Sequence, residues 1–159
     1  MLGWRICRKR YVASALSGVG AEKHGGRWNH KGDRMVYKSS SLSLATLEMF
    51  VHVQPDSLPS ELYSVAVTIP EAASTEEWKI SDLPKNWRNY PAPRRLQELG
   101  STWLRERRSL LLIVPSAVNP TEHNLMLNPM HTDAAMTTDV ESQPFQFDPR
   151  LWKYSGRRR

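Results

Sequence analysis

The sequence predicts a single α+β domain, and three observations support this fold class. Short apolar runs typical of strands occur beside two amphipathic helical segments, without the regular strand–helix–strand repeat of a parallel α/β sheet. The chain has 159 residues, of which 40% are hydrophobic and 24% charged, as in one ordinary globular domain. No internal repeat or low-complexity segment divides it. We therefore expect one compact core.

The first half of the chain predicts a loop, a strand, a helix and a second strand. Several glycines fall between positions 18 and 32, which suits a loop whose backbone takes positive φ or approaches a ligand closely. Residues 35–37 are typical of a short strand, and serines at 39–41 supply an N-cap for a helix at residues 42–53. Residues 62–69 alternate, which predicts a strand with one buried face.

The second half predicts one more helix and two more strands. Residues 93–108 carry leucines and a tryptophan at helical spacing, opposite a basic side. Residues 110–114, with the sequence LLLIV, form a continuous apolar run typical of a central strand. Phe145 and Phe147 alternate and indicate a last strand, whereas residues 132–143 read as a polar loop.

Cysteine content and apolar run lengths exclude several classes of protein. Cys7 is the only cysteine, which excludes an internal disulfide framework and a Cys-rich zinc site and fits a reducing compartment, so we expect a cytoplasmic protein. The first ten residues carry scattered charges and no apolar stretch of the kind found in a signal peptide. The longest apolar run is far shorter than the ~18 residues that suggest a membrane span. We expect no membrane association.

The chain is basic, with a formal net charge of +6 and a pI of about 9.7. Such a charge attracts nucleic acid, phosphorylated small molecules or an acidic protein. Aromatic residues do not interleave with the arginine clusters, and no nucleic-acid-binding motif occurs, so direct nucleic-acid binding is not expected. A basic nucleic-acid-binding module stays as an alternative. We place the folded domain at residues 1–150 and a basic C-terminal tail at residues 151–159.

The helix at residues 42–53 carries a carboxylate on its apolar side. Leu44, Leu47, Glu48 and Val51 lie on one side at i, i+3, i+4 and i+7 spacing. A carboxylate on a buried helix face is costly unless it is paired or hydrogen-bonded. Glu48 is therefore either a structural carboxylate satisfied by its neighbours or a functional group.

The segment GGRWN, residues 25–29, places an arginine beside two glycines. Arg27 can hold a phosphate through two parallel hydrogen bonds, with Trp28 and Asn29 as candidate substrate contacts beside it. The segment lacks the preceding strand and the glycine spacing of a Rossmann fingerprint. The alternative is a tight turn whose arginine pairs with a surface carboxylate.

Two further features bear on chemistry. Ser116 follows the apolar run at residues 110–114, and strand ends are favoured positions for functional side chains. It lies in no GxSxG elbow, so its role as a nucleophile is weakly supported. Glu48 and His52 are one helical turn apart, but no HExxH motif or compact third ligand accompanies them, so no metal site is expected.

These motifs together resemble the RES-domain family, whose members are toxins of bacterial toxin–antitoxin pairs. The resemblance runs through GWRI, GVGAEKHGGRWNHKG, MVYKSSSLSLATLE, LPKNW, VPSA and NLMLNPMH, and it places the family's Arg, Glu and Ser on Arg27, Glu48 and Ser116. It implies a compact fold like that of the ADP-ribosyltransferase toxins. It also implies that NAD⁺, as a substrate and not a cofactor, is cleaved at the nicotinamide–ribose bond by hydrolysis or phosphorolysis. Transfer of ADP-ribose to a protein is an alternative activity.

The resemblance also implies a role for each candidate residue. Glu48 would stabilise the positive charge that develops on the ribose, and Arg27 would grip the diphosphate with Ser116 hydrogen-bonding beside it. Tyr37 either offers its ring to nicotinamide or is a strand core residue. Arg5 of GWRI is a second candidate phosphate contact.

Partners follow from the same resemblance. It implies a cognate antitoxin with a helix-turn-helix DNA-binding domain, whose other end occludes the active site of the toxin. It also suggests toxin homodimers within larger assemblies. The late motif NLMLNP, which contains Asn124 and Asn128, reads as a turn that supports the cleft.

Overall fold

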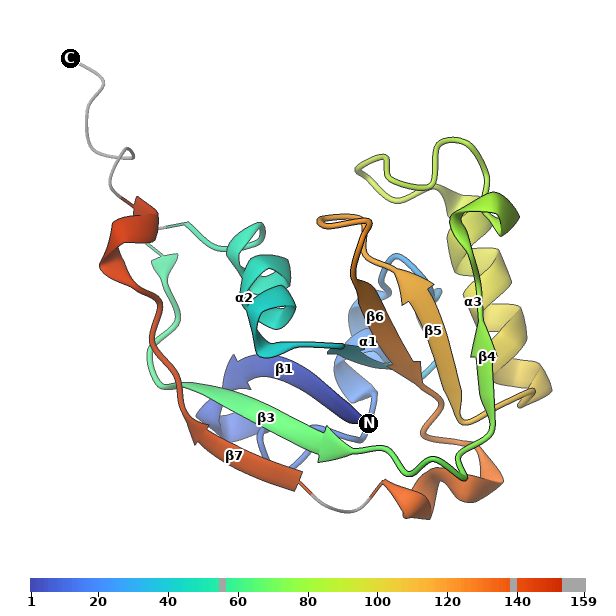
Figure 1. Cartoon of the computed structure of the whole chain (residues 1–159), viewed down its shortest axis with the longest axis horizontal. Coiled ribbons are helices and arrows are strands. Elements are labelled where there is room, and N and C mark those ends of the chain that lie inside the picture. Colours follow the sequence, from blue (N-terminus) through green and yellow to red (C-terminus); the bar gives the residue numbers. More distant parts are fainter. Residues whose placement is uncertain (55–56, 138–139, 153–159) are drawn as a thin grey trace.

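The computed structural model describes residues 1–54, 57–137 and 140–152, and it confirms the α+β class. Its centre is a seven-stranded, strongly curved sheet in the order β4-β5-β6-β2-β1-β3-β7 (Figure 1). Of the strand pairs described, β4 with β5 is parallel and the others are antiparallel. The strands are β1 (Leu2–Arg8), β2 (Val36–Ser39), β3 (Leu62–Thr68), β4 (Thr75–Glu77), β5 (Leu111–Pro115), β6 (His123–Leu127) and β7 (Val140–Pro144).

The described helices are short. The α-helices are α1 (Val19–His24), α2 (Leu42–Phe50) and α3 (Arg94–Glu106), and the 3₁₀ helices include η1 (Lys9–Tyr11), η3 (Ile80–Asp82), η4 (Thr132–Met136) and η5 (Pro149–Trp152). The Ser41 hydroxyl accepts a hydrogen bond from the Leu44 amide, which confirms the predicted N-cap. Within the described ranges, no helix has both the length and the apolar character needed to cross a membrane.

The strand register divides the side chains between two faces of the sheet. Trp4 of β1 lies opposite Ser39 of β2, and Ser39 lies opposite Asn124 of β6. Directly opposed residues of antiparallel strands point to the same face, so these three side chains share one face. α2 packs on this face over β1, where Trp4, Ile6 and Ala45 belong to one hydrophobic cluster.

α3 covers the other half of the same face. Leu96 and Trp103 of α3 share a buried cluster with Leu112 of β5 and Met126 of β6. Met126 lies opposite Leu112 and two residues beyond Asn124, so its side chain points to the same side as Asn124. The two helices therefore flank one region of the sheet, and the candidate site lies in this region.

The second face is also covered, which corrects the prediction for residues 62–69. Val36 and Leu125 pack there with Ile69, and Val65 of β3 packs with Cys7. Leu62, at the start of β3, belongs instead to the cluster under α2. β3 lies between β1 and β7 and is buried on both faces, so the expectation of a single buried face is wrong.

Other predicted elements need correction as well. α2 ends at Phe50, and its predicted apolar stripe is wrong in part, because Leu47 and Val51 are 39% and 55% exposed. The predicted loop at residues 132–143 contains η4 and the start of β7. Phe145 and Phe147 follow β7 and pack edge to face in the cluster under α2, outside any strand.

β1, β4, β6 and α1 were not predicted, and the end of the domain also differs. β1 mixes charged and apolar residues, and β6 is a short strand before a proline turn, so neither shows a clean alternation.

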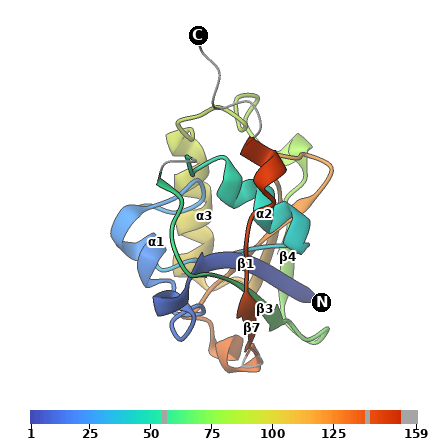
Figure 2. The same ribbon diagram turned by 90° about the vertical axis from the view of Figure 1, so that its left-hand side faces the viewer.

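Leu151 and Trp152 belong to η5 beside α2 (Figure 2), and the Trp152 ring lies 4.7 Å from that of Phe50. These two residues therefore belong to the folded domain, and the rest of the predicted tail lies outside the described residues.

We expect Gly100→Ala to destabilise the protein strongly. A Cβ on Gly100 would lie 1.9 Å from the carbonyl oxygen of Trp28, and backbone cannot move aside cheaply. The expected loss is about 3 kcal/mol of unfolding free energy, or roughly 6–12 °C in Tm. Gly20→Ala is the matched control, since nothing lies within 4 Å of its Cβ position in α1. Thermal melts that show equal effects for the two variants would contradict this packing.

Candidate active site

The GGRWN segment forms a tight turn built around its two glycines. The Gly26 amide donates to the Asn29 carbonyl at 3.0 Å and closes the turn. Gly25 has a φ of 72°, in the left-handed region that favours glycine. The Tyr37 hydroxyl lies so near Gly26 that a Cβ there would be 2.5 Å from it. Gly25 thus takes the positive φ that was one of the two predicted roles, and Gly26 makes room for Tyr37 rather than for a ligand.

Trp28 and Asn29 hold the turn from inside. Trp28 is 2% exposed and Asn29 is fully buried. The Asn29 amide donates at 2.9 Å to three backbone carbonyls, those of Ala21, His30 and Asp33. Its Oδ1 accepts a hydrogen bond from the Tyr37 hydroxyl at 2.7 Å. Both side chains are buried inside the protein and hold the turn in place. The prediction that they contact substrate is corrected: they position the turn that carries Arg27.

Tyr37 is fixed by the same turn. Its hydroxyl donates to Asn29 and accepts from the Trp28 amide at 3.0 Å, and burial raises the pKa of this phenol well above its usual range. The hydroxyl is therefore neutral and structural. Its ring packs against the cluster under α3 and is partly exposed, so the ring is the part of Tyr37 that a ligand can reach.

Arg27 projects from the turn and is oriented by backbone carbonyls. Its Nη1 donates to the carbonyls of Trp87 and Asn89 at 2.6 and 3.1 Å. Burial lowers the pKa of Arg27, while the Glu48 carboxylate opposes that shift. Within the described ranges, Nε and Nη2 of Arg27 bind no acceptor and Arg27 forms no ion pair. The alternative in which Arg27 pairs with a surface carboxylate is therefore wrong. An arginine stays charged under such shifts, so this free edge suits an oxyanion.

Glu48 is half-buried on α2 and is held by two side chains from the other half of the sheet. The Ser116 hydroxyl donates to Oε1 at 2.8 Å, and the Asn124 amide donates to the same oxygen. Ser39 in turn donates to Oδ1 of Asn124 at 2.9 Å. Oε2 accepts no hydrogen bond from any described residue. One carboxylate oxygen is thus fixed, and the other is available to a ligand.

Ser116 lies directly after β5 and is fully buried. Its hydroxyl accepts hydrogen bonds from the amides of Val118 and Asn119 at 3.1 and 3.0 Å, and it donates its single proton to Glu48. The surrounding backbone therefore fixes the direction of the Ser116 hydroxyl. Ser116 acts here by orienting the carboxylate.

Sequence reasoning did not assign Asn124 to this site. The motif that contains it was interpreted as a supporting turn, but HNLML forms β6, with Asn124 and Met126 on the face under the helices. Period-two alternation within these five residues was the available signal. It was weak because the segment is short and one of its polar residues points into the site.

The structure does not bring Arg5 to Glu48. Arg5 alternates along β1 with Trp4 and Ile6, which pack under α2, so its side chain points to the opposite face of the sheet. There its Nη1 donates to the Ala15 carbonyl at 3.4 Å. The expectation that Arg5 contacts the phosphates of a ligand held at Glu48 is therefore corrected.

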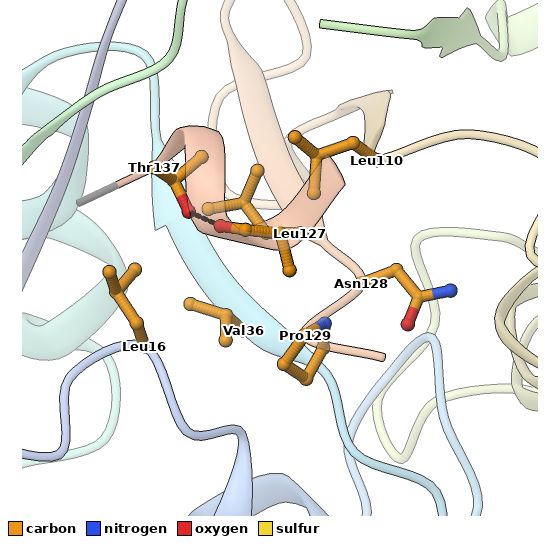
Figure 3. A pocket seen from close by; sticks show the side chains of 8 residues that line it. Leu16, Val36, Leu110, Leu127, Asn128, Pro129 and Thr137 are labelled. Carbon is orange, nitrogen blue, oxygen red and sulfur yellow. Dashed lines mark hydrogen bonds between the residues drawn. The ribbon is translucent and has the colours of Figure 1, made fainter. Parts of the chain in front are cut away.

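A cavity of about 330 Å³ lies on the opposite face as well. Figure 3 shows apolar side chains such as Leu16, Val36 and Leu127 around it. None of its lining residues is charged, so it does not suit a phosphorylated ligand. In the described part of the chain, no cluster of three or more His, Cys, Asp or Glu residues could hold a metal ion.

Comparison with known proteins places the chain in a family. The sequence profile described as RES domain matches residues 2–148. The chain belongs to the RES domain family. A RES relative from Yersinia enterocolitica serotype O:8 / biotype 1B, named Toxin Res, is 45% identical over 152 residues, covering 95% of this chain and 99% of the relative. A Sphingobium sp. relative named Prs ADP-ribosylating toxin is 40% identical over 152 residues, covering 93% and 94%.

A solved structure shows the same fold. The crystal structure of the M. tuberculosis MbcT-MbcA toxin-antitoxin complex contains a chain that superposes with a TM-score of 0.70 at 20% identity, covering 96% of this RES protein and 86% of that chain. The resemblance seen in the motifs is confirmed by these matches. That resemblance predicts the family's Arg, Glu and Ser at Arg27, Glu48 and Ser116. Glu48 and Ser116 are in direct contact, and Glu48 lies near enough to Arg27 to affect its pKa.

Proposed function

We propose that this RES protein is the toxin of a toxin–antitoxin pair and that it cleaves NAD⁺ between nicotinamide and ribose. The observation that carries the proposal is the Glu48 carboxylate near a charged arginine: Ser116 and Asn124 fix one of its oxygens, and no described residue donates to the other. The names of the Yersinia and Sphingobium relatives support the toxin role. The MbcT-MbcA complex supports an antitoxin partner.

The residue inventory suits this chemistry. An ordinary glycosidase needs a second carboxyl group that protonates the leaving oxygen. Nicotinamide leaves NAD⁺ as a neutral molecule and takes the bonding electron pair with it, so one carboxylate suffices. Oε2 of Glu48 accepts a hydrogen bond from a hydroxyl of the nicotinamide ribose and stabilises the oxocarbenium ion electrostatically. The free edge of Arg27 holds the diphosphate.

The acceptor decides the product. In hydrolysis a water oxygen bonds to the ribose carbon and its proton passes to solvent, and in phosphorolysis a phosphate oxygen takes that place. The second candidate function is transfer of ADP-ribose to a protein, which the name of the Sphingobium relative favours. All three reactions share the departure of nicotinamide, and they differ only in what attacks the ribose.

Product analysis with NAD⁺ labelled in its adenylate phosphate tests the proposal. The purified protein should release free nicotinamide, and the label should appear in ADP-ribose for hydrolysis or in a phosphate-dependent phosphorylated ADP-ribose for phosphorolysis. Label that precipitates with a protein in a cell extract identifies transfer instead. Intact NAD⁺ under all three conditions contradicts the proposal. Oligonucleotide binding that survives about 200 mM salt would favour a nucleic-acid-binding module.

The proposed partner is a cognate antitoxin that covers the site. The family resemblance suggests that it carries a helix-turn-helix DNA-binding domain and that two toxin chains pair in the complex. An antitoxin that occludes Glu48 and Arg27 should protect NAD⁺ when added in stoichiometric amount. Mass measurement of the purified toxin and of the complex tests the dimer.

A further inference from the structure

We propose that Arg88 is a second diphosphate-binding residue of this site and that it makes the site prefer dinucleotides to mononucleotides. The inference rests on the proposed NAD⁺ cleavage and goes beyond the residues of the family's Arg, Glu and Ser. It assigns a ligand contact to the segment between η3 and α3, in which the sequence analysis names no site residue.

The segment around Arg88 joins the two sides of the site. Trp87 is 5% exposed and anchors the segment in the cluster under α3. The carbonyls of Trp87 and Asn89, on either side of Arg88, are the two that hold Arg27. The Arg88 side chain extends to the Ala117 carbonyl, which its Nε meets at 3.1 Å. Arg88 thus connects the backbone that orients Arg27 with the residue that follows Ser116.

The way each guanidinium is held leaves an edge free. Arg27 uses Nη1 for carbonyls, which leaves the edge formed by Nε and Nη2. Arg88 uses Nε, which leaves the edge formed by Nη1 and Nη2 without a hydrogen-bond partner among the described residues. Each edge can bind two oxygens of one phosphate in parallel. Two such edges match the two phosphates of a diphosphate.

The charge of Arg88, unpaired among the described residues, favours a role in ligand binding over a purely structural role. Several other arginines are paired with carboxylates, as in Arg34 with Glu22 and Arg105 with Asp33. Arg88 is exposed, and no described carboxylate forms an ion pair with it. Arg27 and Arg88 each form no ion pair among the described residues, and two such cations near the same site attract a diphosphate. Nicotinamide mononucleotide carries only one phosphate and would engage only Arg27.

Substrate preference tests this assignment. Initial rates are measured with NAD⁺ and with nicotinamide mononucleotide for the wild type and for Arg88→Ala. We expect Arg88→Ala to raise KM for NAD⁺ about tenfold or more, which is the scale of one lost charge-assisted contact, with kcat nearly unchanged. Turnover of the mononucleotide should change less than twofold, so the preference for NAD⁺ falls. Arg88→Lys keeps the positive charge but cannot donate two parallel hydrogen bonds, so its KM for NAD⁺ should lie between those of the wild type and Arg88→Ala.

Lys85→Ala is the matched control, since Lys85 is exposed on the same segment and its removal changes the net charge equally. It should leave both substrates unaffected, and melts of all variants check the fold. Equal losses on both substrates would mean that Arg88 only supports the site, and unchanged KM values would mean that it does not bind the ligand. Both results overturn the inference while NAD⁺ cleavage by the wild type stands. A wild type that leaves NAD⁺ intact defeats the proposed function itself.

Discussion

Glu48→Gln should slow NAD⁺ cleavage by roughly 10²–10³-fold without unfolding the protein. A glutamine keeps an oxygen that can accept from both Ser116 and Asn124, so the contacts that fix the side chain survive. It loses the negative charge that stabilises the oxocarbenium ion. Removing one such electrostatic contact costs about 2.7–4 kcal/mol in the transition state, or roughly 10²–10³-fold in rate. Nicotinamide release by the purified variant measures this loss, with an unchanged melting temperature as the check on folding.

Glu122→Gln is the matched control for this experiment. Both oxygens of Glu122 are engaged, Oε1 by the Ser41 hydroxyl and Oε2 by the Asn119 amide, so neither is available to a ribose hydroxyl. We expect its activity to stay within about tenfold of the wild type, because the change removes charge beside the site and no ligand contact. Full activity of Glu48→Gln, or equal losses in the two variants, would remove Glu48 from the proposed role.

Lys38→Met should stabilise the protein at neutral pH. Lys38 on β2 is 2% exposed, and no described residue forms a hydrogen bond with its Nζ. Its side chain lies on the face opposite α2, where Arg5 and Cys7 also point. A buried amine without a partner is costly in either protonation state, whereas methionine fills similar space. We expect a gain of about 1–4 kcal/mol in unfolding free energy, measured by urea denaturation.

The stability difference should depend on pH in a defined direction. Burial, with a smaller contribution from the Arg5 charge, lowers the pKa of Lys38 from 10.5 to about 7. Above pH 7 the folded protein has released this proton while the unfolded chain still binds it, so wild-type stability rises by about 1.4 kcal/mol per pH unit. Below pH 7 both states are protonated and the slope vanishes. The advantage of Lys38→Met should therefore be largest near pH 6 and shrink toward pH 8.5.

Two features of this pH experiment separate Lys38 from other groups. The range stops at pH 8.5 because burial raises the pKa of the Cys7 thiol in the folded protein, so that at higher pH ionisation of this thiol in the unfolded chain would also change stability. Lys23→Met changes an exposed lysine of α1 and should give no pH-dependent difference from the wild type. A Lys38→Met advantage that stays constant between pH 6 and 8.5 would show that the buried amine does not titrate as inferred.

Local sequence patterns were sufficient to predict the helices and strands whose residue patterns are pronounced. Ser41 capped the helix that carries Glu48, and the LLLIV run gave β5, with Ser116 after it. The patterns failed where tertiary contacts replaced local preference. β1 was missed because its two faces are both covered. Arg5 and Cys7 are half-buried or buried against residues distant in sequence. The strand therefore lacks the alternation of exposed polar and buried apolar residues by which a strand is predicted.

The sequence by itself determined the fold class and the family and predicted Arg27, Glu48 and Ser116 as site residues, because these inferences depend on residue types at short fixed spacings. Only the tertiary structure decided that Asn124 joins them and that Arg5 lies on the far face of the sheet. Which way a strand residue points is set by register with partner strands, and a shift of one residue reverses it. That register arises from contacts between distant segments, which short-range patterns do not contain.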